Sequence, residues 1–179
     1  NNMDTHIDII AAPQYKSFEE LEQNNVKLSK VWLSKFSKEE YIEKAGFEPE
    51  FGKIIGLGVT SYTRGVMEIK TKVTEEKAML ESFAEMCNHV IYKWHHNLVL
   101  VGCGIKSFDL SFLLRRYILT NTNMPKILQQ LTSKKPYELG SFVTDISEMY
   151  GNSPQSKFGK NIDAISASLG LESESEYLG

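Results

Sequence analysis

The stretch LVGCGIKSFDLSFLLRR, residues 100–116, decides how this chain is interpreted. Its pattern predicts an apolar strand, a turn with two glycines, and a helix that begins near Phe108 and Asp109. A glycine-rich turn between a strand and a helix can bind a nucleotide, because it brings backbone N–H groups close to the phosphates. An aspartate at the same junction can instead bind a divalent metal ion. The rest of the sequence distinguishes these two interpretations.

A nucleotide-binding turn would need further signals that this sequence lacks. LVLVGCG, residues 98–104, is similar to the first motif of methyltransferases and to half of a dinucleotide-binding fingerprint. However, Ser107-Phe108 stands where G-x-G-x-x-G needs small residues, and no carboxylate for a ribose follows about 20 residues on, in ILTNTNMPK. A nucleotide-binding, methyltransferase-like domain is therefore the least favoured alternative, and the glycines are interpreted as an ordinary turn.

Composition and charge limit the classes of function. The chain has 179 residues, 41% hydrophobic and 24% charged, which are ordinary values for a single globular domain over residues 1–179. The net charge of −3 argues against indiscriminate binding to nucleic acid but permits a local basic groove. No apolar run reaches the roughly 18 residues of a membrane span. Because two cysteines form no disulfide framework, we expect a cytoplasmic protein without membrane contact.

Periodicity and turn signals predict an α/β order of elements. Residues 14–50 are expected to form a helical insertion after the first strand, with capping boxes at Ser17 and Ser37. Asn1-Asn2-Met3 is left out of the predicted fold, and the tail 172–179 is expected to be acidic and solvated. The predicted strands are 6–12, 53–62, 66–73 and 98–101. The predicted helices are 75–92, 125–131 and 157–169, together with a helix whose apolar face runs over residues 110–118 and a short helix after 144–145.

Two aspartates are placed to meet in such a fold. A hairpin connected through a helix to a further strand predicts a mixed sheet. Asp8 in the first strand and Asp109 after the fourth can then lie at one edge of that sheet. Two Mg²⁺ ions about 3.5–4 Å apart, held by carboxylates, can activate water and stabilise the leaving oxygen in phosphodiester cleavage. The alternatives are a hydrogen-bonded Asp8 and an Asp109 that caps its helix.

A resemblance to a known family runs from about residue 8 to residue 171. The stretches that carry it are HIDIIAAPQYKSFEEL, EFGKIIGLGV, EEKAMLESFAEMC, LVGCGIKSFDLSFLLRR, MPKILQQLTSKKPYELGSFVTDISEMYG and IDAISASLGL. In order and spacing they resemble the predicted 3′–5′ exonucleases related to the proofreading domain of family-B DNA polymerases, in the ribonuclease H-like superfamily. The resemblance implies a ribonuclease H-like mixed β-sheet flanked by helices. It also implies cleavage of single-stranded nucleic-acid ends with Mg²⁺ or Mn²⁺.

The resemblance assigns three aspartates to the metal site. Asp8 and Asp109 match the catalytic, metal-binding aspartates of the first and second motifs. Asp145 matches an aspartate that lies between the second and third motifs and would help to bind metal. The alternative for Asp145 is that it bonds to the backbone at a helix N-terminus.

Four further residues are assigned to nucleic-acid binding. Phe108 would pack against a terminal base, and the alternative is that it packs in the core. Lys106, Arg115 and Arg116 lie near the expected cleft and would contact phosphates. The alternative is that these cations are solvated helix charges.

The sequence departs from the family pattern where catalysis depends on it. Ile10 occupies the position of the first-motif glutamate, and an isoleucine cannot coordinate a metal. Cys103 and Gly104 replace a histidine and an asparagine in the second motif, and the last motif, Tyr-x-x-x-Asp, has no counterpart. We therefore expect a weakened or inactive exonuclease, unless Glu68 or Asp145 compensates. The alternative is a non-catalytic nucleic-acid- or protein-binding module on the same scaffold.

Overall fold

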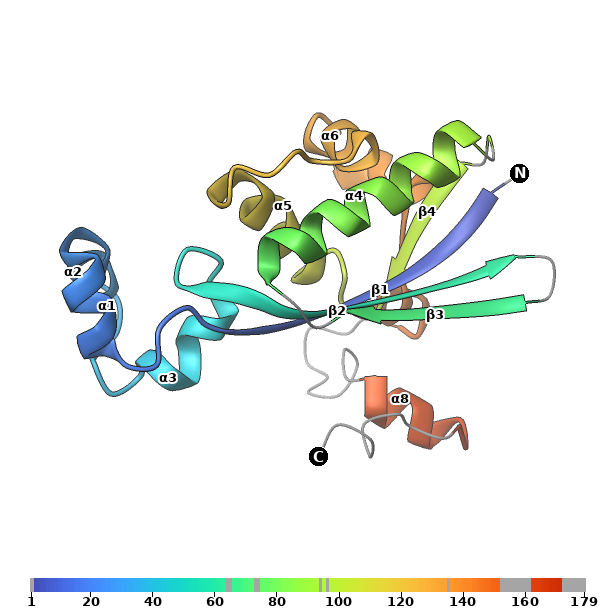
Figure 1. Cartoon of the computed structure of the whole chain (residues 1–179). Helices are drawn as coiled ribbons and strands as arrows, with labels where there is room; N and C mark the ends of the chain where they lie inside the picture. Colours follow the sequence, from blue (N-terminus) through green and yellow to red (C-terminus); the bar gives the residue numbers. More distant parts are fainter. Residues whose placement is uncertain are drawn as a thin grey trace.

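The computed structural model describes residues 2–63, 66–72, 75–93, 95, 97–134, 136–151 and 162–171 (Figure 1). The strands are β1 (Asn2–Pro13), β2 (Gly52–Thr63), β3 (Val66–Lys72), β4 (Asn97–Gly102) and β5 (Val143–Asp145). The helices are α1 (Phe18–Asn24), α2 (Val26–Leu33), α3 (Tyr41–Lys44), α4 (Glu76–Lys93), α5 (Asp109–Leu119), α6 (Lys126–Thr132), α7 (Ile146–Met149) and α8 (Ile162–Ser168), with 3₁₀ helices η1 (Ala45–Phe47) and η2 (Pro136–Ser141).

The strands form one mixed sheet in the order β3-β2-β1-β4-β5. β1 pairs antiparallel with β2 and parallel with β4, β2 pairs antiparallel with β3, and β4 pairs parallel with β5. The predicted α/β class and mixed sheet are therefore confirmed, and the arrangement is compatible with a ribonuclease H-like fold. Because β2 runs antiparallel beside β1, the sheet does not have the parallel strand order of a methyltransferase-like domain.

β1 is central and alternates strictly between its two faces. Met3, Thr5, Ile7 and Ile9 are buried, while the intervening polar residues and Ile10 are exposed. The exclusion of Asn2 and Met3 from the fold is wrong, because Met3 is only 3% exposed and pairs with Leu98 of β4, while Asn1 lies outside the described residues. A polar residue, Asn2, followed by the apolar Met3 already begins the alternation of the strand, so the sequence indicated that β1 includes these residues.

α4, α5 and α6 cover one face of the sheet, and α8 lies on the other (Figure 1). α4 buries the expected face, including Leu80, Phe83 and Cys87. In α5 the expected apolar face is partly wrong, since Ile118 is 69% exposed. Leu113 of this helix faces the core. Ile118 comes five positions later and lies about 140° around the helix axis from Leu113, so it faces solvent.

The predicted helical insertion is present and has a cluster of buried side chains of its own. Its helices α1, α2 and α3 project away from the sheet (Figure 1), around Phe18, Leu21, Trp32, Tyr41, Ala45 and Phe51. Ser17 Oγ accepts the Glu20 N–H at 3.2 Å, and the Ser37 N–H donates to Glu40 Oε2 at 2.8 Å. Ser17 therefore caps α1 as expected, whereas the bond at Ser37 lies in a turn, because α3 begins only at Tyr41 with Glu40 at its N-cap position.

The C-terminal part contains a strand that the sequence did not predict. β5 spans only Val143–Asp145, which is too short to show a period. Of the predicted helix 157–169, the structure has α8, in which Ile165 is buried while Ile162 and Leu169 are exposed. Residues 157–161 and the acidic tail 172–179 lie outside the described residues.

Candidate functional site

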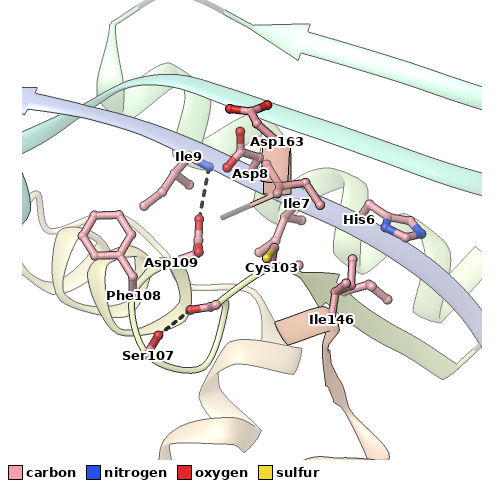
Figure 2. A pocket seen from close by; sticks show the side chains of 14 residues that line it. His6, Ile7, Asp8, Ile9, Cys103, Ser107, Phe108, Asp109, Ile146 and Asp163 are labelled. Atoms are coloured by element: carbon pink, nitrogen blue, oxygen red, sulfur yellow. Dashed lines mark hydrogen bonds between the residues drawn. The ribbon is translucent and has the colours of Figure 1, made fainter. Parts of the chain in front are cut away.

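A cavity of about 580 Å³ opens at the edge of the sheet where β4 ends (Figure 2). Asp8 and Ile9 of β1 line it, together with Cys103 and Asp109 from the segment after β4. Asp163 of α8 lines it as well. The two aspartates that the sequence singled out, Asp8 and Asp109, are therefore brought into one cavity.

Asp8 stands on the solvent face of β1. It follows the alternation of the strand, so its side chain points away from the helical layer formed by α4 and α5. Its carboxylate reaches solvent, yet the cavity walls partly bury it and raise its pKa above the ordinary value, more than the nearby Ile9 N–H lowers it. Asp8 is thus a partly desolvated carboxylate at the open side of the cavity.

The Asp109 side chain provides a hydrogen-bond acceptor for the backbone of β1. Pairing of β1 with β4 ends at His6 and Val101, so the residues of β1 after His6 form no register pair with β4. The Ile9 N–H donates instead to Asp109 Oδ1 at 3.3 Å. Asp109 is the first residue of α5, whereas the N-cap position belongs to Phe108. The bond from Ile9 to Asp109 therefore joins the helix to β1, which is a different role from a simple helix cap.

Asp109 is the electrostatically strained member of the pair. It is only 6% exposed. Burial, and then the negative charge of Asp8, raise the pKa of Asp109 to about 6, against the weaker stabilisation by the Ile9 N–H. The pKa of the Cys103 thiol is also raised, by burial and by the charges of Asp145, Asp109 and Asp8. The cavity therefore has a negative field that disfavours further negative charge.

The two glycines of the deciding stretch serve the turn itself. A Cβ on Gly102 would stand 2.9 Å from Ile105 Cβ and 3.1 Å from Ile7 O, so only glycine fits there. Gly104 has φ 72°, a left-handed conformation that favours glycine, and its carbonyl accepts the N–H groups of Ser107 and Phe108 at 3.0 Å each. These contacts account for both glycines without a bound phosphate.

The Asp145 carboxylate holds this turn through hydrogen bonds to its backbone. Its carboxylate accepts from the Gly104 N–H at 2.9 Å and the Lys106 N–H at 3.1 Å, and from the N–H and Oγ of Ser147 at 3.0 and 2.6 Å. Burial opposes its charge, but these bonds outweigh burial and lower its pKa. Asp145 is the N-cap of α7, as the alternative interpretation expected, and it does not belong to the residues that line the cavity.

Of the four residues assigned to nucleic acid, Phe108 is the one that lines the cavity. Arg116 is 5% exposed and binds Glu76 at 2.6 Å and Pro49 O at 2.9 Å, so its guanidinium holds α5 to α4 and to the insertion. Lys106 and Arg115 are accessible but form ion pairs, Lys106 with Glu148 at 2.6 Å and Arg115 with Glu50 at 3.3 Å.

Ile10 lies on the same strand face as Asp8 and is 42% exposed. A carboxylate at position 10 would therefore lie on the same face of β1 as Asp8. Glu68, considered as a compensating acid, pairs with Ser61 through the β3 backbone. Its side chain lies outside the described part of the structure.

Asp163 is a cavity residue that the sequence did not reveal. It comes from α8, and Figure 2 shows it at the same end of the cavity as Asp8. It stands in IDAISASLGL, a stretch that carries the resemblance but in which no residue is assigned to the site. Only the packing of α8 against the face of the sheet opposite α4 brings it to the site.

The donor set fits one divalent ion more readily than a preformed two-ion centre. Mg²⁺ typically binds through one or two carboxylates, several waters and substrate phosphates, and Asp8 and Asp109 provide two such carboxylates. A cation would also offset the repulsion that raises the pKa of Asp109. Among the described residues, no group of three or more His, Cys, Asp or Glu side chains is placed to hold an ion together.

Comparisons with known proteins add no identification. Neither the protein-family models nor the curated proteins searched contain a match to this chain. Within the described ranges, none of the helices has both the length and the apolar character needed to cross a membrane. The fold and the cavity are therefore the basis for assigning function.

Proposed function

We propose that this chain is an exonuclease-type domain whose cavity binds Mg²⁺ or Mn²⁺ and the end of a single-stranded nucleic acid, with weak hydrolysis of the terminal phosphodiester. The observation that carries the proposal is the pair Asp8 and Asp109. A buried carboxylate with a raised pKa beside a second carboxylate destabilises the fold, and such arrangements gather at functional sites.

Each residue of the cavity has a role in this proposal. Asp8 and Asp109 hold the cation, and the Ile9 N–H orients Asp109. A bound cation supplies Lewis-acid stabilisation of charge on the phosphodiester oxygens. Phe108 forms the wall on which the end of the strand rests, and Asp145 keeps the turn that carries Phe108 in place. Ile10 explains why hydrolysis is weak, because it removes one carboxylate from the set.

A second candidate is a non-catalytic module that binds nucleic acid or protein through the same scaffold. Ile10 favours it, as does the lack of a three-ligand group among the described side chains. Both candidates are consistent with a reducing, cytoplasmic setting, which we propose because Cys87 and Cys103, the two cysteines of the chain, form no disulfide.

The first experiment is titration of Mn²⁺ into the full chain, followed calorimetrically, and repeated with Asp109→Asn. We expect binding in the millimolar range that Asp109→Asn abolishes. Asp4→Ala is the matched control, because Asp4 is an exposed aspartate on the same face of β1 but does not line this cavity. Release of a label from the 3′ end of a single-stranded oligonucleotide in Mn²⁺ then tests hydrolysis.

The outcomes separate the two candidates. Weak Mn²⁺-dependent release that is lost in Asp109→Asn and kept in Asp4→Ala supports the exonuclease-type site. Retained binding of the oligonucleotide with no release, in wild type and variants alike, supports the non-catalytic module. Mn²⁺ binding that Asp109→Asn leaves unchanged contradicts the assignment of Asp109 as a ligand.

A further inference from the structure

A row of aromatic rings leads from the core to the surface beside the cavity. Phe112 is 1% exposed, and its ring centroid lies 5.4 Å from that of Phe108, which lines the cavity. The ring centroids of Phe108 and Phe47 lie 6.2 Å apart, and the two ring planes are inclined at 61°. Phe47 is 67% exposed. The helical insertion therefore places an open aromatic ring next to the wall of the carboxylate cavity.

Phe47 belongs to neither hydrophobic cluster. Phe108 packs against the main core, and the insertion has its own cluster around Trp32, but Phe47 is part of neither. Burial in a core therefore does not account for a phenylalanine at this position, and the ring contact that the structure gives it is with Phe108 of the cavity wall.

The backbone around Phe47 is fastened to the end of β1. A Cβ on Gly46 would stand 3.3 Å from Ala12 Cα, so η1 lies directly against the strand. The Gln14 N–H donates to Phe51 O at 2.8 Å, and the Gly52 N–H donates to Glu48 O at 2.7 Å. These bonds fix the chain immediately after Phe47, and the close approach of Gly46 to Ala12 places the residue before it. Its position beside Phe108 is thus built into the junction between the insertion and the sheet.

We propose that Phe47, together with Phe108, binds the unpaired terminal base of the nucleic-acid strand whose phosphate enters the cavity. This inference rests on the proposed function and adds the helical insertion to the substrate site. Aromatic rings bind successive unpaired bases by stacking, without preference for sequence. Phe47 is a positioning residue in this scheme, since it meets the base while the carboxylates meet the phosphate end.

The test measures binding of a single-stranded oligonucleotide that carries 2-aminopurine at its 3′ end, in Ca²⁺ so that hydrolysis does not interfere. Stacking quenches 2-aminopurine fluorescence, and the same oligonucleotide with the probe at an internal position is the comparison. We expect Phe47→Ala to weaken binding about tenfold, the order of effect of one base–aromatic stack, and to remove the terminal quenching. Phe47→Tyr should retain both, because it keeps the ring.

Val31→Ala is the matched control, since it removes an exposed apolar side chain from the same insertion without approaching the cavity. Unchanged binding and quenching in Phe47→Ala, with wild type binding normally, overturns the role of Phe47 and leaves the proposed function intact. Failure of the wild-type chain to bind the oligonucleotide overturns both. Because Phe47 is mostly exposed, loss of folding in Phe47→Ala is not expected, and circular dichroism of each variant verifies this.

Discussion

Asp109 and Asp145 are nearly equally buried, 6% and 4% exposed, and lie on either side of the same turn, yet they are held in opposite ways. Asp145 accepts four hydrogen bonds, and its pKa is lowered. For Asp109 the structure gives one longer bond from Ile9, and burial and the charge of Asp8 raise its pKa. The bonds of Asp145 hold the turn together, whereas those of Asp109 leave its charge largely uncompensated.

The comparison separates a carboxylate whose charge is compensated by hydrogen bonds from one whose charge is not. A buried charge is stable when hydrogen-bond donors surround it, and carboxylates with perturbed pKa values gather at functional sites. From the sequence, both aspartates are assigned to the metal site. Their hydrogen-bond partners separate them, and of these Gly104, Lys106 and Ile9 come from distant segments.

The largest effect is expected for Asp145→Ala. It leaves the N–H groups of Gly104, Lys106 and Ser147 without their acceptor, so we expect a loss of about 3 kcal/mol in the free energy of unfolding. Chemical denaturation measures it. Asp145→Asn keeps one acceptor oxygen and should lose less. A loss below about 1 kcal/mol in Asp145→Ala would contradict the role of this side chain.

Asp109→Asn should change the free energy of unfolding in the opposite direction and stabilise the fold. The pKa of Asp109 rises from 3.8 to about 6 on folding, so its contribution to stability is complete below pH 4 and is lost as the pH rises through 6. An amide resembles the protonated form at every pH. We therefore expect Asp109→Asn to be more stable than wild type by about 1–2 kcal/mol near pH 7.5, and the difference to vanish near pH 4.

Thermal or chemical unfolding as a function of pH measures this difference. The same variant should lose Mn²⁺ binding, so that stability and function change in opposite directions at one residue. Destabilisation by Asp109→Asn near neutral pH would show that Asp109, like Asp145, mainly supports the fold.

A smaller effect is expected from Ile10→Glu. This residue is partly exposed on the same strand face as Asp8, so a glutamate can be accommodated and adds a carboxylate on the side of the cavity. We expect about fivefold tighter Mn²⁺ binding, roughly 1 kcal/mol, and faster release of the 3′ label. Ile10→Gln has the same size without the charge and is the control. Equal behaviour of the two variants would mean that position 10 does not face the cation.

Much of the fold could be predicted from local pattern. The alternation of β1, the apolar run of β4, the amphipathic face of α4 and the capping boxes at Ser17 and Ser37 each act within a few residues. β5 escaped prediction because three residues show no period. The exposure of Ile118 escaped it because the rotation of α5 depends on what the helix packs against.

The site was predictable only in part. Asp8 and Asp109 are predicted from their places in the first strand and after the fourth, and from a family resemblance. Asp163 lies in a stretch that carries the resemblance, but no residue there is assigned to the site, since Asp163 reaches the cavity only through the packing of α8. Arg116 is assigned to phosphate contact, with a solvated helix charge as the alternative, and its burial beside Glu76 depends on a helix far away in the chain.

The sequence by itself determined the α/β class, the β-hairpin, the helical insertion, and the apolar residue Ile10 two positions after Asp8. These features depend on residue type and short-range periodicity. Only the tertiary structure decided which aspartate is satisfied, which cation is buried, and which aromatic ring of the insertion stands open beside the cavity. The physical reason is that desolvation and hydrogen bonding depend on neighbours brought together by folding, and sequence distance does not measure them.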